Sequence, residues 1–175
     1  DFGQGRIYRG DEEMTGGFGF YTSILAKGYW QDSQNVLWEI SRSDESTLLA
    51  RGYWVDLPLS QVWRIRLSEQ GLIEWDVELE VYEQVKLEEV QANIMLDQDY
   101  RNASGRILEV RSGQSALPKS IAFLLDDPHS MCNRKEVEKA TFLNSAPMLQ
   151  YYGILNADLQ PGRYKNYFKG RIRIK

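Results

Sequence analysis

Apolar residues occupy every second position from Trp63 to Leu67 and again from Ile73 to Val81. A period of two residues is typical of strands that bury one face. Gly71, between the two stretches, suits the left-handed position of a three-residue hairpin loop. The sequence therefore predicts a β-hairpin over residues 62–81.

The charged residues of this hairpin predict the same register as the apolar ones. A loop at Gly71 places Arg66 opposite Glu74 and Arg64 opposite Asp76, and such opposite charges stabilise a strand pair. A slip of one residue would destroy both the apolar and the charged pairing. We expect Trp63 and Trp75 to lie in the core. The hairpin also carries a row of four acidic residues, Glu74, Asp76, Glu78 and Glu80. We interpret this row as a solvated, ion-paired face rather than as the paired carboxylates of a glycoside hydrolase.

Short strand-like stretches, separated by Gly, Asp, Ser and Asn clusters, continue on both sides of the hairpin. The apolar positions change parity near Glu88-Glu89, which predicts a β-bulge. Asn133-Arg134-Lys135-Glu136 matches a capping box and predicts a short helix that ends near Ala140. We therefore predict an all-β protein, an antiparallel β-sandwich of jelly-roll or supersandwich type with one short helix, formed by a single domain over residues 1–175.

One phrase stands twice in the chain, as Ala26-Lys27-Gly28-Tyr29-Trp30-Gln31-Asp32 and as Ala50-Arg51-Gly52-Tyr53-Trp54-Val55-Asp56. We expect two equivalent strands, in which the adjacent Tyr and Trp face opposite ways. A structural role for the repeat is one interpretation. The other is sugar binding, because an aromatic ring packs on the C–H face of a sugar while charged side chains bind its hydroxyls. The candidate ligand-binding residues are Trp30, Trp54, Tyr29, Tyr53, Asp32, Asp56, Arg51 and Lys27.

Composition narrows the classes of partner. The net charge of the 175-residue chain is −4, and Lys and Arg are scattered, which argues against a nucleic-acid surface. No apolar run reaches the roughly 20 residues that a membrane span needs. The single Cys132 cannot form an internal disulfide, so the cytosol and an exported location both fit, and we favour an extracellular or periplasmic one. A start at Asp1 suggests a module excised from a larger protein, whose other domains would be partners.

Other chemistry-bearing residues have ordinary interpretations. Asp97-Gln98-Asp99 and Asp126-Asp127 could offer oxygen ligands to Ca²⁺, but turn chemistry is the favoured interpretation and we expect no cofactor. His129 and Cys132 lie close in sequence, yet no Gly-x-Ser-x-Gly elbow accompanies them. We therefore predict no catalytic residue. The glycine-rich stretch 15–19 lacks the ending of a phosphate loop and predicts a turn.

The segments Gln61–Leu67 and Ile73–Val81 resemble the long antiparallel strands of the galactose-mutarotase-like supersandwich and of accessory carbohydrate-binding modules. The resemblance implies a sandwich that handles sugars and is attached to a glycan-processing enzyme. Mutarotases use histidines with a carboxylate, whereas His129 is the only histidine of this chain and lies outside the matching strands. The resemblance therefore implies binding, and no catalytic residue is carried over.

Three functional hypotheses follow. The first is a non-catalytic module that binds an oligo- or polysaccharide through an aromatic platform. The second is a structural or assembly domain that contacts a neighbouring domain or subunit through an exposed apolar patch. The third is a sugar hydrolase or epimerase, which requires two carboxyl groups that converge in one cleft.

Overall fold

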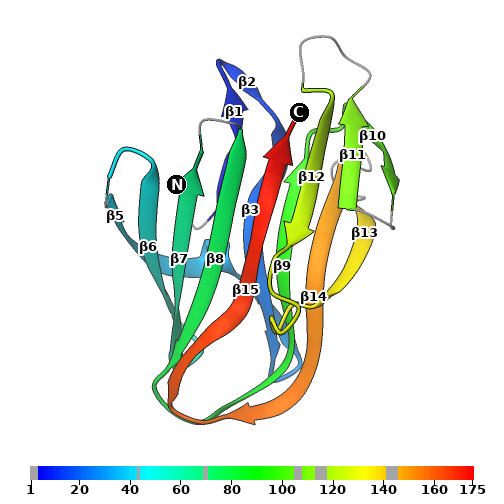
Figure 1. Cartoon of the computed structure of the whole chain (residues 1–175). Helices are drawn as coiled ribbons and strands as arrows, with labels where there is room; N and C mark the ends of the chain where they lie inside the picture. The colour runs from blue at the N-terminus through cyan, green and yellow to red at the C-terminus, as the bar shows by residue number, and fades with distance from the viewer. Residues whose placement is uncertain (1–3, 43, 69–70, 105–107, 113–117, 141–145) are drawn as a thin grey trace.

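The computed structural model describes residues 4–42, 44–68, 71–104, 108–112, 118–140 and 146–175. Within them, two antiparallel sheets pack face to face, which confirms the all-β sandwich (Figure 1). The larger sheet has, in spatial order, β10 (Tyr100–Ser104), β11 (Leu108–Ser112), β12 (Ser120–Leu125), β15 (Gly162–Ile174), β8 (Leu72–Val81), β7 (Leu59–Leu67), β6 (Thr47–Trp54) and β5 (Val36–Arg42). The smaller sheet has β13 (Arg134–Ala140), β14 (Ala146–Leu159), β9 (Val85–Leu96), β3 (Thr15–Ala26) and β4 (Tyr29–Asp32).

The hairpin predicted from the alternating pattern is β7–β8, and its register is confirmed. Ile65 pairs with Trp75, Arg66 with Glu74 and Arg64 with Asp76. Gly71 has a φ of +70°, as the loop requires, while residues 69–70 lie outside the described residues. Buried and half-buried residues alternate along the whole of β8, so the period of two residues identified the inner face correctly.

The helix predicted from the capping-box pattern is wrong, because residues 134–140 form strand β13. Helical structure among the described residues is a 3-10 turn, η1 (Ser33–Asn35). The bulge predicted near Glu89 is present in the β9–β14 ladder, but the extra residue belongs to β14, between Ile154 and Ala157. Asn156 there has a φ of +44°, which turns the strand locally.

Aromatic rings from both sheets form the centre of the core. Trp75 is fully buried, and its ring centroid lies 5.1 Å from that of Trp63 and 5.3 Å from that of Phe168 within the larger sheet. Phe20 of the smaller sheet lies 5.0 Å from Trp75 in an edge-on arrangement. Trp63 is only 3% exposed. Both tryptophans of the hairpin are therefore core residues, as predicted.

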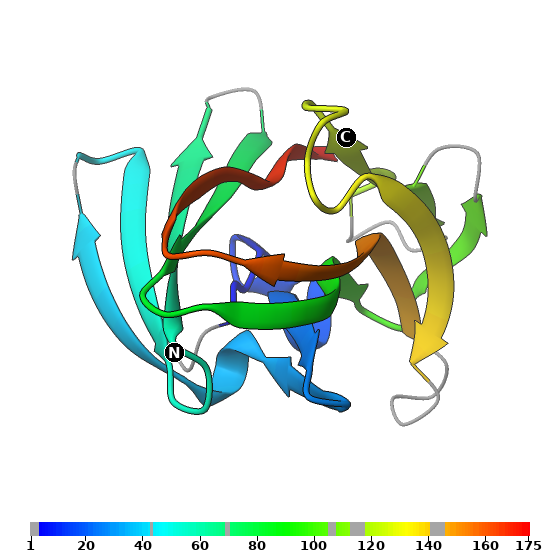
Figure 2. The same cartoon turned by 90° about the horizontal axis from the view of Figure 1, so that it is seen from below.

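Two connections cross from sheet to sheet side by side at one end of the sandwich. β8 continues into β9 and β14 continues into β15, and the partners pair in each sheet, β9 with β14 and β8 with β15. Figure 2 shows both crossings from below. A third crossing, η1, carries the chain from β4 to β5. η1 is held by both sheets, because Ser33 Oγ accepts the N–H of Thr22 (3.2 Å) and its carbonyl accepts the indole N–H of Trp38 (2.8 Å).

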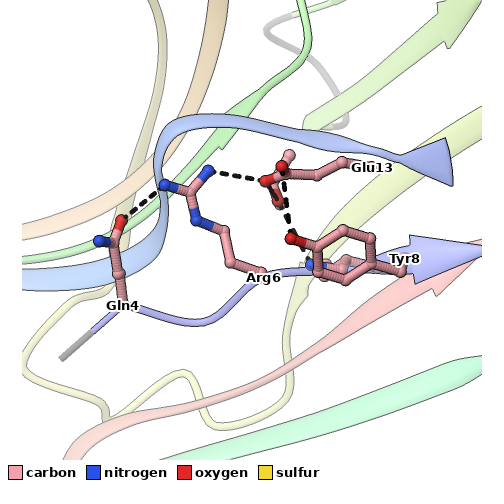
Figure 3. A network of polar contacts seen from close by, with 6 residues as sticks. Gln4, Arg6, Tyr8 and Glu13 are labelled. Atoms are coloured by element: carbon pink, nitrogen blue, oxygen red, sulfur yellow. Dashed lines mark hydrogen bonds and ion pairs between the residues drawn. The ribbon is translucent and has the colours of Figure 1, made fainter. Parts of the chain in front are cut away.

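The N-terminal segment closes the other end through a small hairpin, β1 (Tyr8–Arg9) with β2 (Glu12–Glu13). A polar network holds it (Figure 3): Arg6 Nη1 donates to Glu13 Oε1 at 2.6 Å, and Arg6 Nη2 donates to Gln4 Oε1 at 3.1 Å. Gly5 forms a bridge with Phe20, and a Cβ at Gly5 would lie 1.9 Å from the Phe20 ring. This segment therefore needs a glycine to lie against the core.

Candidate functional site

The two copies of the repeated phrase have different local structures, so the prediction of two equivalent strands is wrong. In the first copy, Lys27 (φ +55°) and Gly28 (φ +76°) form the two-residue turn of the β3–β4 hairpin, closed by the pairing of Ala26 with Tyr29. This is the φ pattern of a type I′ turn. In the second copy, Arg51 and Gly52 are extended residues inside β6 and pair with both β5 and β7.

The glycines of the two copies therefore serve different purposes. Gly28 supplies a positive φ in open space, and its N–H donates to Glu88 Oε1 at 2.9 Å. Gly52 supplies room instead, since a Cβ there would lie 2.7 Å from Val36 Cγ1 and 2.8 Å from Trp38 Cζ2. Glycine is therefore required in the first copy by the backbone conformation and in the second copy by side-chain packing.

Nevertheless, both copies contribute to one surface hollow of about 480 Å³. It lies between the tip of the β3–β4 hairpin and the turn after β6, beside η1. Five of the eight predicted ligand-binding residues line it: Lys27, Tyr29, Trp30, Trp54 and Asp56. The structure thus brings together most of the first phrase and the end of the second, which stand 24 positions apart in the sequence.

The aromatic rings of the hollow differ in exposure. Tyr29 is 75% exposed and Trp30 is 47% exposed, because β4 is an edge strand with a neighbour on one side. Trp54 is only 5% exposed and forms part of the core. Its Nε1 is buried without a hydrogen-bond partner among the described residues. The hollow therefore has two accessible rings from the first copy and a buried ring from the second.

The other three predicted residues lie elsewhere. Arg51 and Tyr53 project from the outer face of the larger sheet, where Arg51 forms an ion pair with Glu80 and the Tyr53 hydroxyl donates to Glu39 Oε2 (3.4 Å). Asp32 lies on the smaller sheet, and its Oδ1 accepts the Ser23 hydroxyl at 2.6 Å. Alternation along β6 separates Arg51 and Tyr53 from Trp54, whereas Asp32 lies on the same face of β4 as Trp30 but beyond the hollow.

Two further polar residues line the hollow that the sequence reasoning did not single out, Gln31 and Asn35. Gln31 occupies the variable position of the first phrase, and Asn35 belongs to η1. The hollow therefore contains the side-chain amides of Gln31 and Asn35, which both donate and accept hydrogen bonds, in addition to the charged groups of Lys27 and Asp56. Asn35 was not singled out because the 3-10 turn η1, which directly follows the first phrase and places Asn35 at the hollow, was not predicted.

The acidic row of β8 is ion-paired, as predicted. Glu74 pairs with Arg66 at 3.2 Å, Glu78 with Arg163 at 2.6 Å, and Glu80 with Arg51. Asp76 lies among these residues with Arg64 and Lys169 nearby, and partial burial raises its pKa above the usual range despite these two cations. The row is thus a charged layer on the outer face of the larger sheet.

Replacing Asp76 with asparagine is expected to raise the free energy of unfolding at pH 7. The pKa of Asp76 is raised in the folded protein, so the native state favours the protonated carboxyl. Above pH 3.8, where this carboxyl is ionised in the unfolded chain, that preference lowers the free energy of unfolding. Solvent screening keeps the gain below about 1 kcal/mol. Urea denaturation at several pH values would show a difference between variant and parent that shrinks toward pH 4. A loss of stability at pH 7 would mean that attraction to Arg64 and Lys169 outweighs burial.

The other residues considered from the sequence as metal-binding or catalytic candidates have ordinary structural environments. The side chains of Asp97 and Asp127 each accept a backbone N–H two residues on, at 2.9 Å, which confirms turn chemistry. His129 is an exposed loop residue. Cys132 is fully buried, and burial raises the pKa of its thiol well above the usual value, so it stays protonated. The turn predicted for residues 15–19 is wrong, because they belong to strand β3, whose pairing with β9 shifts register between Thr15 and Phe20.

Comparison with known proteins adds no relative. A scan against models of protein families finds no match, and a search of curated proteins finds no similar sequence. Among the described residues, no helix has the length and apolar character needed to cross a bilayer. Nor do these residues contain a group of three or more His, Cys, Asp or Glu side chains placed to hold a metal ion.

Proposed function

We propose that the protein binds a carbohydrate, without catalysis, at the hollow formed by the two phrases. The observation that supports this most directly is the convergence of Tyr29, Trp30 and Trp54 with Lys27 and Asp56 around about 480 Å³. Ligand sites are concave, with an apolar wall and a few polar groups that orient the ligand. This hollow has both components at a size suited to one or two sugar rings.

The accessible faces of Tyr29 and Trp30 are the expected contact for the C–H face of a sugar ring. Lys27, Asp56, Gln31 and Asn35 provide donors and acceptors for its hydroxyls. The buried N–H of Trp54, which has no partner among the described residues, would be stabilised by an acceptor that reaches the floor. Each type of group in the hollow thus matches a part of a sugar.

Binding fits better than hydrolysis because Asp56 is the one carboxylate among the described residues that line the hollow. Glycoside hydrolysis by the usual mechanisms needs two carboxyl groups at a defined separation. The acidic residues of β8 lie on the outer face of the larger sheet and are held by arginines. Accordingly we assign no catalytic residue.

Replacing Trp30 or Tyr29 with alanine is expected to weaken polysaccharide binding about tenfold or more, because each change removes an exposed ring and about 1.4 kcal/mol of binding energy corresponds to tenfold. Affinity electrophoresis through gels that contain a panel of soluble polysaccharides would measure the retardation. Tyr29 is 75% exposed and Trp30 47% exposed, and both lie on an edge strand, so circular dichroism should stay unchanged and the urea midpoint should change little.

The matched control is Tyr8→Ala. Tyr8 is 56% exposed but lies in the β1–β2 hairpin, next to the N-terminal end of β3 (Figure 1), whereas the hollow is lined by Ala26 at the other end of that strand. This variant should be retarded as strongly as the parent protein. The proposal is contradicted if no polysaccharide in the panel retards the parent, or if all three variants behave alike.

A second candidate function is docking of another protein segment along β5. In the described part of the chain β5 pairs only with β6, and its Leu37 and Ile40 are 68% and 61% exposed. An apolar hollow of about 210 Å³, lined by Trp38, Ile40 and neighbours, adjoins this edge. Unpaired strand edges with apolar side chains are sites of strand addition. Sedimentation at rising concentration would reveal self-association, whereas a binding module should stay monomeric.

A further inference from the structure

The outer face of the smaller sheet continues directly from the hollow through Trp30. Trp30 pairs with Leu25, which pairs with Glu89, so the three form one row across β4, β3 and β9. The adjacent row on the same face consists of Asp32, Ser23 and Gln91. Strand alternation assigns both rows to the outer face, because the intervening residues, such as Ile24 and Val90, are fully buried.

A directional chain of hydrogen bonds runs across this face. Gln150 Nε2 donates to Asn93 Oδ1 (3.0 Å). Asn93 Nδ2 then donates along two branches, to Gln91 Oε1 and to Ser23 Oγ, both at 3.3 Å. Gln150, Asn93 and Ser23 are 4%, 1% and 3% exposed, so these side chains are fixed by burial as well as by bonding.

Both branches end on a carboxylate. Gln91 Nε2 donates to Glu89 Oε1 at 3.1 Å, and the Ser23 hydroxyl donates to Asp32 Oδ1 at 2.6 Å. Each carboxylate thus accepts one bond that fixes its orientation. Neither forms an ion pair with an Arg or Lys among the described residues, and no bond within them reaches Asp32 Oδ2 or Glu89 Oε2. Asp32 and Glu89 are half-buried, and each therefore presents a carboxylate oxygen that can accept a hydrogen bond from a ligand.

These acceptors flank an apolar surface of suitable size. Half-buried Leu25 of β3 lies between Trp30 of β4 and Glu89 of β9. Neighbouring strands lie about 4.8 Å apart, so Trp30 and Glu89 at the two ends of this row are separated by roughly 10 Å. A sugar ring that extends beyond the hollow would pack on Trp30 and Leu25 with its hydroxyls toward the two carboxylates. Both carboxylates can only accept, so the matching group must donate.

We infer that the glycan bound at this site is neutral and extends from the hollow over Trp30 onto Asp32 and Glu89. This inference rests on the proposed function. With Asp56 in the hollow, three carboxylates face the path and Lys27 is the cation among the described residues that line the hollow. Hydroxyl groups donate to such carboxylates, whereas the carboxylate of a uronic acid or a sulfate ester would be repelled by them.

The test compares neutral with anionic polysaccharides in the same affinity gels. We expect retardation by a neutral galactomannan or β-glucan and none by polygalacturonate or heparin. The variants Asp32→Asn and Glu89→Gln keep the acceptor oxygen for Ser23 or Gln91, so the fold should be unchanged. Each removes a charge-assisted bond, and we expect about tenfold weaker binding to the neutral polysaccharide.

Glu136→Gln is the matched control, since Glu136 is an exposed carboxylate of β13, the far edge strand of the same sheet, and should leave binding unchanged. Stronger binding to an anionic polysaccharide overturns the inference while sugar binding stands. So does a Trp30→Ala variant that loses binding when Asp32→Asn and Glu89→Gln retain it fully. Absence of retardation by every polysaccharide overturns the proposed function itself.

Discussion

Replacing Trp75 with alanine is expected to lower the free energy of unfolding by about 3–5 kcal/mol, the range for truncating a buried aromatic residue. The indole is fully buried and contacts rings from both sheets, with centroid distances of 5.0 Å to Phe20, 5.1 Å to Trp63 and 5.3 Å to Phe168. The cavity would lie where the sheets meet, so neither sheet can close it alone. Urea denaturation followed by circular dichroism measures the loss.

A pair of conservative variants separates ring packing from hydrogen bonding. The Nε1 of Trp75 has no partner among the described residues, whereas Trp63 Nε1 donates to Gln61 Oε1 at 3.1 Å. Trp75→Phe should therefore cost clearly less than Trp63→Phe, which also removes a buried bond of about 1 kcal/mol. An equal cost for both Phe variants would show that the bond from Trp63 to Gln61 adds nothing to stability, and a small cost for Trp75→Ala would show that this cluster is not the main stabilising contact between the sheets.

The hairpin β7–β8 was predictable because two independent patterns agree on it. The apolar residues determine which face of each strand is buried, and the charged pairs Arg66–Glu74 and Arg64–Asp76 determine the register. Both patterns act between residues close in sequence. Trp63 and Trp75 could for the same reason be assigned to the core from their positions alone.

Strand β13 was not predictable in this way. Asn133-Arg134-Lys135-Glu136 satisfies a local helix-start pattern, and no strong apolar period opposes it. Its conformation is determined instead by pairing with β14, from Arg134 opposite Tyr152 to Ala140 opposite Ala146. Tertiary contacts override so weak a local preference.

The repeated phrase shows the same limit at the site. Lys27-Gly28 turns because β3 and β4 pair on either side of it, and Arg51-Gly52 stays extended because β5 and β7 flank it. Residue types were enough to name aromatic and charged side chains as candidates for a binding site. They could not predict that the first copy would expose both of its rings, that Trp54 would be buried, or that η1 would bring Asn35 alongside.

Replacing Gly153 with alanine is expected to lower the free energy of unfolding by about 3 kcal/mol or more, the upper range for forcing an extra methyl into a packed core. A Cβ at this position of β14 would lie 1.8 Å from the Met131 carbonyl oxygen. The neighbouring backbone cannot move freely, because Met131 N–H donates to the Asn166 carbonyl (2.6 Å) and Cys132 N–H to the Tyr167 carbonyl (3.1 Å). Chemical denaturation measures the loss.

Cys132 gives this prediction a second readout, because its thiol is fully buried and follows Met131 directly. Displacement of this segment should make the thiol react with a disulfide reagent under native conditions, while the parent protein stays unreactive. Gly10→Ala is the control: a Cβ there meets no atom within 4 Å, so only the φ of +61° opposes it, at about 1–2 kcal/mol. Equal losses for both variants, with Cys132 still unreactive, would mean that the Met131 segment yields to the methyl group without leaving the core.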